Sequence, residues 1–276
     1  MNSSMKLSCA TSVFLNYSIF DAVPLIAQAG CQGIDLWGGR PHLYRHDHSP
    51  ADLKRLRGLL EDHHLEPVSM MPAFFRYPHS LSSPNDAVRK DSIDYMRLCL
   101  ENAVALGARI LLIVPSRALS GQTQEDARQR LIDSIAEVSR EAAQYDLWLG
   151  IEPANRFVTD LVTTSADALY IIKQVNYPRL GVVMDTGHIN LTGESAADAM
   201  NRLGSLLLQW HYNDNDGQHQ QNKVPGEGSF DFAGFIQTLR QANYQGFLSL
   251  ELGWDYSFAP VPGVTDGIGR MRALLG

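Results

Sequence analysis

The stretch Leu180-Gly-Val-Val-Met-Asp185-Thr-Gly-His188-Ile-Asn190 contains an apolar run that stops abruptly at a carboxylate. Such a run, rich in β-branched residues, is typical of a strand buried on both faces in a parallel sheet. A carboxylate at the end of a buried strand costs free energy unless a partner compensates for its burial. Asp185 therefore either caps the following turn or points into a functional site.

The same pattern of apolar strand, polar loop and amphipathic helix recurs along the whole chain. It predicts strands at residues 6–14, 33–37, 67–72, 108–114, 147–152, 180–185, 205–211 and 246–251. It predicts helices at residues 21–29, 50–64, 86–106, 123–145, 165–175, 196–203 and 231–242, with a short helix near Gly269. Strands that alternate with helices form a parallel sheet, and eight such units in about 250 residues fit a closed (β/α)8 TIM barrel.

We therefore predict a single α/β barrel domain over residues 1–276, because no linker or shift in composition interrupts the pattern. An open, doubly wound sheet is the alternative. That fold would place a Gly-x-Gly-x-x-Gly motif after an early strand, and the sequence has none.

Composition excludes several classes of protein. The 276 residues carry a net charge of −7, which argues against a general affinity for nucleic acid. The sequence has no stretch of 18 apolar residues and no signal-peptide pattern at its start, so we expect no membrane association and a cytoplasmic location. Its three cysteines are scattered and predict neither a disulfide framework nor a structural zinc site.

Four consecutive predicted strands end in residues that can bind a metal, namely Glu152, Asp185, His211 and Glu251. The carboxyl ends of all strands in a TIM barrel meet on one face, so these side chains are expected to converge. Each could be capped separately, but four in succession are better explained by a shared site. Three carboxylates brought together repel one another unless a cation joins them. Mostly oxygen donors favour a hard or borderline ion, and we predict one divalent cation, Mn²⁺, with Co²⁺ or Mg²⁺ as alternatives.

Several motifs resemble those of known sugar isomerases and epimerases. Residues 152–157, Glu-Pro-Ala-Asn-Arg-Phe, resemble the Glu-x-x-Asn-Arg-Phe of ketose 3-epimerases that act on tagatose and psicose, and residues 184–190 resemble their Leu-Asp-Thr-x-His-Met-Asn. His211 with the following Asn-Asp-Asn-Asp and Pro-Gly-Glu-Gly is similar to the wider superfamily of xylose-isomerase-like TIM barrels. Residues 37–42, Trp-Gly-Gly-Arg-Pro-His, resemble the fructoselysine 3-epimerase branch.

The resemblance implies a metal held by Glu152, Asp185, His211 and Glu251, with the two glutamates also acting as acid and base. It implies an isomerase that epimerises C3 of a ketose through a cis-enediolate, which the metal stabilises as a Lewis acid. Aldose–ketose isomerisation or epimerisation of a keto-glycoside on the same site are the alternatives. The expected partner is a small sugar, and a homodimer or homotetramer is expected.

Substrate contacts are predicted around this centre. His188 is expected in the loop above the sixth strand, as a substrate-binding group or else a surface histidine. Asp216 either touches substrate or belongs to a turn, for which Asn-Asp-Asn-Asp-Gly is a good sequence. A distal pocket is expected to be lined by Trp37, Arg40, His42, Phe74, Phe75 and Tyr77. For the aromatic residues, the alternative is packing at the barrel mouth or a dimer contact.

Two positions depart from the ketose 3-epimerase pattern. Gly217 stands where many members of the family have a substrate-binding arginine, and Val158 stands where they often have glutamate. These differences leave the metal ligands intact. They favour a modified ketose or a keto-glycoside over a free hexulose.

Two other functions remain to be weighed. An abasic-site endonuclease family shares this barrel, but it gathers three zinc ions with extra histidines, and the matching positions here are Gln220 and Asn222. A catalytically silent sugar-binding barrel is the second possibility. A binding protein has no need of two opposed bases, so the complete ligand set favours the enzyme.

Overall fold

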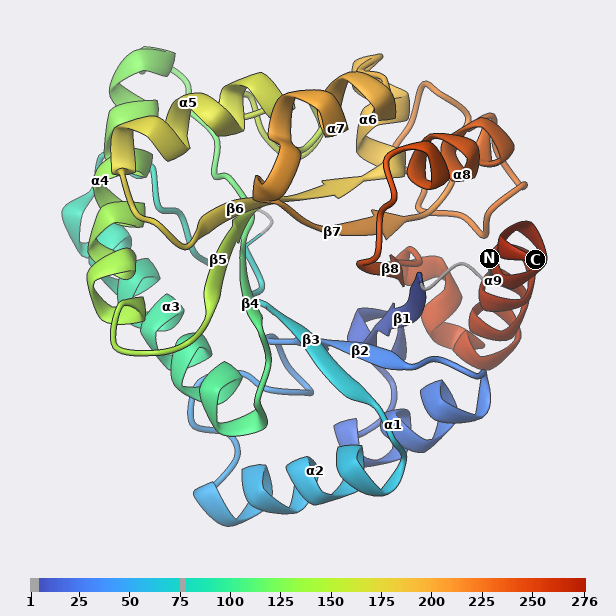
Figure 1. Ribbon diagram of the computed structural model, residues 1–276. Helices are drawn as coiled ribbons and strands as arrows, with labels where there is room; N and C mark the ends of the chain where they lie inside the picture. Colours follow the sequence, from blue (N-terminus) through green and yellow to red (C-terminus); the bar gives the residue numbers. More distant parts are fainter. Residues whose placement is uncertain (1–4, 75–77) are drawn as a thin grey trace.

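The computed structural model describes residues 5–74 and 78–276, and its eight parallel strands form a closed barrel in the order β1 to β8. The strands are β1 Lys6–Ala10, β2 Gly33–Trp37, β3 Glu66–Met71, β4 Ile110–Ile113, β5 Trp148–Ile151, β6 Leu180–Asp185, β7 Leu207–Tyr212 and β8 Phe247–Leu250. Helices form a ring around them (Figure 1). The prediction of a (β/α)8 TIM barrel is confirmed.

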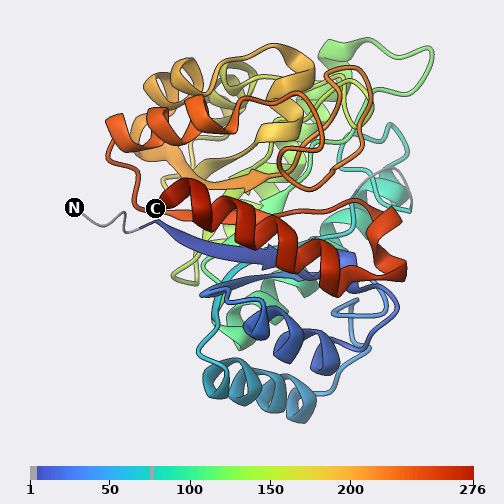
Figure 2. The same cartoon turned by 90° about the vertical axis from the view of Figure 1, so that its right-hand side faces the viewer.

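The helices follow the strands in chain order. The α-helices are α1 Ile19–Gln28, α2 Pro50–Asp62, α3 Asp86–Leu106, α4 Gln124–Ala142, α5 Ser165–Val175, α6 Thr186–Thr192, α7 Ala196–Leu203, α8 Phe232–Gln241 and α9 Pro260–Leu275. The 3₁₀ helices are η1 Thr11–Phe14, η2 Gly204–Leu206 and η3 Trp254–Phe258. The start of β1 and the end of α9 lie at one end of the barrel, and long loops gather at the other end (Figure 2). No helix among the described residues has the length and apolarity needed to cross a membrane.

Local sequence signals place several helix ends. Ser49 caps α2 with a capping box, and Pro50 occupies its first turn. Gly107 ends α3 in the left-handed conformation, with φ of 80°, which glycine adopts without a steric penalty.

Three predicted elements differ from the structure. The first strand ends at Ala10 rather than residue 14, because Thr11–Phe14 turn into η1 and the Thr11 hydroxyl accepts a hydrogen bond from the Trp37 backbone N–H at 2.8 Å. Helix α6 follows Asp185 directly, where a loop was expected. The last helix is not short but has 16 residues, and its prolines and glycines hide it from a prediction based on helix propensity.

A polar network crosses the barrel interior. The fully buried Asp35 carboxylate accepts hydrogen bonds from Ser69 Oγ at 2.6 Å, Gln209 Nε2 at 2.7 Å and Ser249 Oγ at 2.5 Å. These donors compensate for burying the charge. Gln209 and Ser249 stand two residues before His211 and Glu251, and therefore on the same face of their strands. The network ties β2 and β3 to the two strands that carry these predicted ligands.

Candidate metal centre and substrate cavity

The structure brings all four predicted ligands together at the carboxyl ends of neighbouring strands. One possible ligand atom from each of Glu152, Asp185, His211 and Glu251 lies within 4.8 Å of the others. Glu152 and Glu251 directly follow β5 and β8, Asp185 ends β6, and His211 is the penultimate residue of β7. Convergence of the strand ends in a closed barrel is therefore sufficient to assemble the cluster.

His211 lies between the two glutamates. Its Nδ1 is 2.8 Å from Glu152 Oε1 and 3.2 Å from Glu251 Oε2. Burial alone would lower the pKa of His211, but the two carboxylates outweigh it and raise this pKa well above its usual value. For the acid Glu251 the effects are reversed. Burial alone would raise the pKa of Glu251, but its hydrogen bond with His211 brings that pKa below the usual value.

Asp185 is the carboxyl group whose ionisation the cluster disfavours. Burial, assisted by the repulsion of Glu251 and Glu152, raises the pKa of Asp185 to about 6. His211 Nε2 is buried and has no hydrogen-bond partner within the described chain. A buried set of three carboxylates and one imidazole, held together by a proton on His211, fits a divalent cation, which would supply the missing positive charge.

Both sequence-based interpretations of Asp185 hold together. Its Oδ1 caps helix α6 by accepting a hydrogen bond from the His188 N–H at 2.8 Å, and its Oδ2 accepts one from Asn213 Nδ2 at 2.7 Å. Thr186 in turn holds the Asn213 backbone. The Thr186 hydroxyl accepts a hydrogen bond from the Asn213 N–H and donates one to the Asn213 carbonyl oxygen. A Cβ at Gly187 would overlap the Asn213 side chain, so this close approach requires glycine.

His188 lies in the first turn of α6 and is only 9% exposed, so its expected place in a loop is wrong, as is the surface alternative. Asn155 Nδ2 is 2.8 Å from His188 Nδ1. The Asn155 Oδ1 accepts a hydrogen bond from the Phe157 N–H at 2.9 Å, which orients the amide with its Nδ2 toward the ring. Nδ1 is therefore the acceptor, and we assign the ring proton to Nε2.

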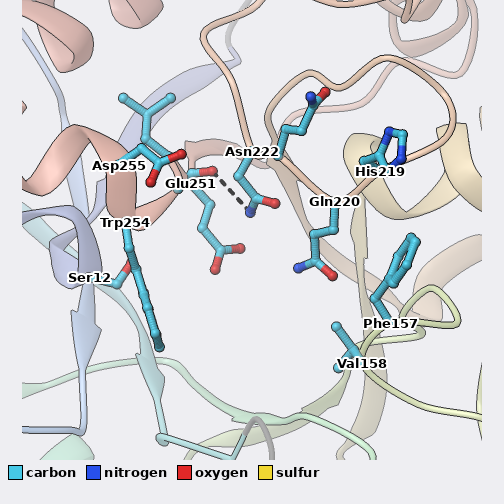
Figure 3. Close-up of a pocket in the computed structure, with 12 residues that line it drawn as sticks. Ser12, Phe157, Val158, His219, Gln220, Asn222, Glu251, Trp254 and Asp255 are labelled. Carbon is cyan, nitrogen blue, oxygen red and sulfur yellow. Dashed lines mark hydrogen bonds between the residues drawn. The ribbon is translucent and has the colours of Figure 1, made fainter.

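Two adjoining cavities, which share part of their lining, lie at this end of the barrel. The inner one, of about 20 Å³, is lined by Trp37, Glu152, His188 and Glu251 among others. The outer one, of about 760 Å³, opens toward Trp254 and is shown in Figure 3. The shared lining residues are Val158, Gln220, Asn222 and Glu251. Glu251, a member of the candidate metal cluster, is therefore exposed to both cavities.

The loop after β7 brings Gln220 and Asn222 to both cavities. Its base is fixed by the fully buried Asp214, whose carboxylate accepts hydrogen bonds from four backbone N–H groups at 2.8–3.1 Å. These belong to Asn215, Gly226, Gly228 and Phe230. A Cβ at Gly228 would overlap the Asn215 backbone and the Asp214 carboxylate, so the Gly-Glu-Gly motif allows this approach.

Arg40 and His42 line neither cavity. Arg40 is exposed, bonds Asp47 at 2.6 Å and stacks on Tyr44. His42 is fully buried, with Nδ1 3.2 Å from Thr11 Oγ1 and Nε2 3.2 Å from the Phe14 carbonyl oxygen. Burial lowers the pKa of His42 to about 4, so its neutral ring packs beneath η1. Of the three residues predicted from the second strand, only Trp37 faces a cavity.

Asp216 lies in the turn that its sequence favours. Its carboxylate accepts hydrogen bonds from the N–H groups of Gln218 and His219, both at 2.8 Å, and contacts the His219 ring at 2.9 Å. It does not line either cavity, whereas His219 stands at the rim of the outer one.

The aromatic residues predicted after the third strand are only partly described. Phe74 is 2% exposed and stacks on Tyr95 with ring centroids 5.6 Å apart. Phe75 and Tyr77 lie outside the described residues. Packing at the barrel mouth, which was the alternative to a substrate contact, accounts for Phe74.

The metal-free protein should lose stability as the pH rises. His211 and Asp185 both have raised pKa values in the folded state, so folding retains protons that the unfolded chain releases. The contribution of Asp185 is lost between its ordinary pKa of 3.8 and about pH 6, and that of His211 as the pH rises through its raised value. The lowered pKa of Glu251 changes the stability only below about pH 4.5, the ordinary glutamate pKa, and so does not affect the loss of stability at higher pH.

We therefore expect the Tm of chelator-treated protein to fall by roughly 2–4 °C or more between pH 5 and pH 8 in a thermal unfolding scan. Saturation with Mn²⁺ should remove most of this fall, because the cation replaces the proton. A metal-free Tm that is constant or rises over this range would contradict the assignment.

Comparison with known proteins places these features in a wider group. Residues 23–274 match the model of the family described as xylose isomerase-like TIM barrel. Fructoselysine 3-epimerase of Escherichia coli O157:H7 is 25% identical over 249 residues, which are 90% of each chain.

Solved structures with the same fold include 3-keto-D-glucoside 4-epimerase from E. coli, with a TM-score of 0.82 and 19% identity over 98% of this chain and 99% of that one. The IOLI protein with a bound zinc atom has a TM-score of 0.80 and 20% identity over 98% of each chain. At these identities the structures establish the shared fold.

Proposed function

This chain belongs to the xylose isomerase-like TIM barrel family, and we propose that it is a divalent-metal-dependent sugar epimerase acting next to a ketose carbonyl. The family resemblance predicted from the sequence is confirmed. Its relatives include carbohydrate epimerases, in agreement with the prediction of an isomerase. The observation that carries the proposal is the cluster of Glu152, Asp185, His211 and Glu251 at the base of an open cavity.

The donor set supports Mn²⁺ as the cation, with Co²⁺ or Mg²⁺ as alternatives, and the zinc atom in the IOLI structure shows that a relative of this fold accepts a divalent ion. When bound, the cation would polarise the sugar carbonyl and stabilise the negative charge that develops on its oxygen. Glu152, Asp185, His211 and Glu251 would hold it.

The two glutamates supply the proton chemistry. Epimerisation breaks the C3–H bond, and its electron pair forms the C2–C3 double bond of an enediolate as the carbonyl electrons move to oxygen. One glutamate, as the carboxylate, accepts the C3 proton, and the other, which enters the step protonated, delivers its proton to the opposite face as the carbonyl reforms. Glu152 and Glu251 approach His211 from two different strands, β5 and β8, as opposed bases require.

His188 orients the sugar. With Nδ1 bonded to Asn155, its Nε2–H is the donor on the ring that lines the inner cavity. We propose that it donates a hydrogen bond to a substrate oxygen beside the reacting carbons. Trp37 lines the same cavity.

The alternatives use the same centre differently. An aldose–ketose isomerase would transfer a proton between C1 and C2, and a keto-glycoside epimerase would act beside a carbonyl within a glycoside. The endonuclease is disfavoured, because Gln220 and Asn222 line the cavity where further zinc-binding histidines would be needed.

The test is NMR of ketoses and keto-glycosides in deuterated water with the Mg²⁺ or Co²⁺ enzyme. We expect deuterium at the carbon whose configuration is inverted, which is C3 in a 2-ketose, together with formation of the epimer. Deuterium at C1 with formation of an aldose would instead identify an isomerase. No exchange into any sugar by fully metal-loaded enzyme would contradict the proposed function.

A further inference from the structure

The outer cavity is much larger than the reacting end of a sugar requires. Its volume of about 760 Å³ lies in the range of roughly 300–1,000 Å³ that encloses drug-sized ligands. The inner cavity, of about 20 Å³, adjoins the metal centre. Glu251 lines both, so a ketose bound against Glu251 leaves most of the outer space for whatever is attached to it.

The walls of the outer cavity combine a flat aromatic face with amides. Trp254 is 58% exposed although it is large and apolar, and its ring stands across the cavity from the Gln220 side chain, with the Glu251 carboxylate pointing between them (Figure 3). Gln221 and Asn222 extend the amide wall. A pyranose ring has an apolar C–H face that packs on an aromatic ring, and hydroxyls that need both donors and acceptors, which amides provide.

The amide wall is held in place before a ligand binds. The Asn222 carbonyl oxygen accepts a hydrogen bond from the Gly253 N–H at 2.8 Å, and Gln221 Oε1 accepts one from the Asp216 N–H at 3.0 Å. The Gln220 amide makes no hydrogen bond within the described chain and lines both cavities. It is therefore placed to bond a hydroxyl near the junction of two linked rings.

The charges in the lining disfavour a substrate whose attached group is itself charged. The ionisable residues that line the outer cavity are His219, Glu251 and Asp255, and the described lining has neither lysine nor arginine. A phosphate or carboxylate would therefore meet negative charge without a cationic partner. Asp255 is exposed, so its attraction for an ammonium group is weakened by water.

We propose that the outer cavity binds a second, uncharged sugar ring that is linked to the reacting ketose, packed on Trp254 and hydrogen-bonded by Gln220. This inference rests on the proposed epimerase function and names its substrate class. The substrate is a glycosylated keto sugar rather than a free or phosphorylated hexulose.

The test compares deuterium exchange at C3 for four probes: D-fructose, a glucosyl-fructose disaccharide with an unblocked C3 hydroxyl, fructose 6-phosphate and an aminoalkyl-substituted fructose. We expect kcat/KM for the disaccharide to exceed that for D-fructose by about tenfold or more, with the phosphate poorest. Trp254→Ala should lower kcat/KM for the disaccharide about tenfold, mainly through KM, and change that for D-fructose less than about twofold.

Phe258→Ala provides the matched control. Phe258 lies on the same 3₁₀ helix, is 87% exposed and does not line the cavity, so its loss should leave both substrates unaffected. Equal kcat/KM with and without the glucosyl group, a preference for the amine, or an equal loss for both sugars in Trp254→Ala would overturn the inference.

Failure of the proposed function would look different, because the wild-type enzyme would then exchange none of the four probes. Calorimetric titration with the disaccharide decides the inference in that case. Binding weakened about tenfold by Trp254→Ala but unchanged by Phe258→Ala would support the second-ring site, and the absence of binding to wild-type protein would refute it.

Discussion

Replacing Glu251 with glutamine should lower deuterium exchange at the reacting carbon by roughly 10²–10⁴-fold, the typical contribution of a positioned acid or base. The glutamine amide has nearly the same shape as the glutamate carboxylate. In the wild type His211 Nδ1 is 3.2 Å from Glu251 Oε2, and the amide oxygen can still accept this hydrogen bond. It cannot accept the C3 proton. Glu152→Gln should have a similar effect, since inversion needs both groups.

A measurement of metal binding distinguishes a variant that has lost only its catalytic base from one that has lost the metal site. Glu251→Gln should still bind a stoichiometric cation, with lower affinity than the wild type, in a calorimetric titration with Mn²⁺. Glu227→Gln is the matched control, because it removes a carboxylate that bonds Tyr256 in the neighbouring loop, outside the metal cluster. Exchange in Glu251→Gln within tenfold of wild type would rule out the two-base mechanism.

Removing the cation with a chelator should reduce turnover to background, and adding Mn²⁺ or Co²⁺ should restore it. In the metal-free protein the raised pKa of His211 keeps a proton between Glu152 and Glu251 at neutral pH. The cation must displace this proton, so binding should release close to one proton per site near pH 7, and affinity should increase with pH. Calorimetric titration in two buffers of different ionisation enthalpy measures the proton release.

Apo-enzyme that keeps full activity, with elemental analysis showing far less than one metal per chain, would contradict the metal-dependent mechanism. Uptake of protons on binding would contradict the assigned charge state of His211.

The barrel and the cluster of four candidate ligands could be predicted from the sequence because both depend on local patterns. Each strand is an apolar run, and each candidate ligand stands where a run ends, so the closure of the barrel alone brings Glu152, Asp185, His211 and Glu251 together. The prediction needed no knowledge of side-chain packing.

The surroundings of the centre were harder to predict because they depend on distant contacts. His42 follows a cavity residue by only five positions, yet its ring turns back under η1. The roles of Asn155, which orients His188, and of Asn213, which holds Asp185, appear only when three strand ends are placed side by side. Trp254 gave no periodic signal, since it lies in a short 3₁₀ helix.

The single carboxylate of Asp214 fastens both ends of the excursion between β7 and α8, from Asn215 to Phe230, through backbone groups alone. Because these anchors depend on one side chain, loss of the Asp214 carboxylate should release the whole excursion, including Gln220 and Asn222, which line both cavities. Asn222 Nδ2 also donates a hydrogen bond to the Glu251 carbonyl oxygen at 3.4 Å, so the excursion and the end of β8 hold one another in place.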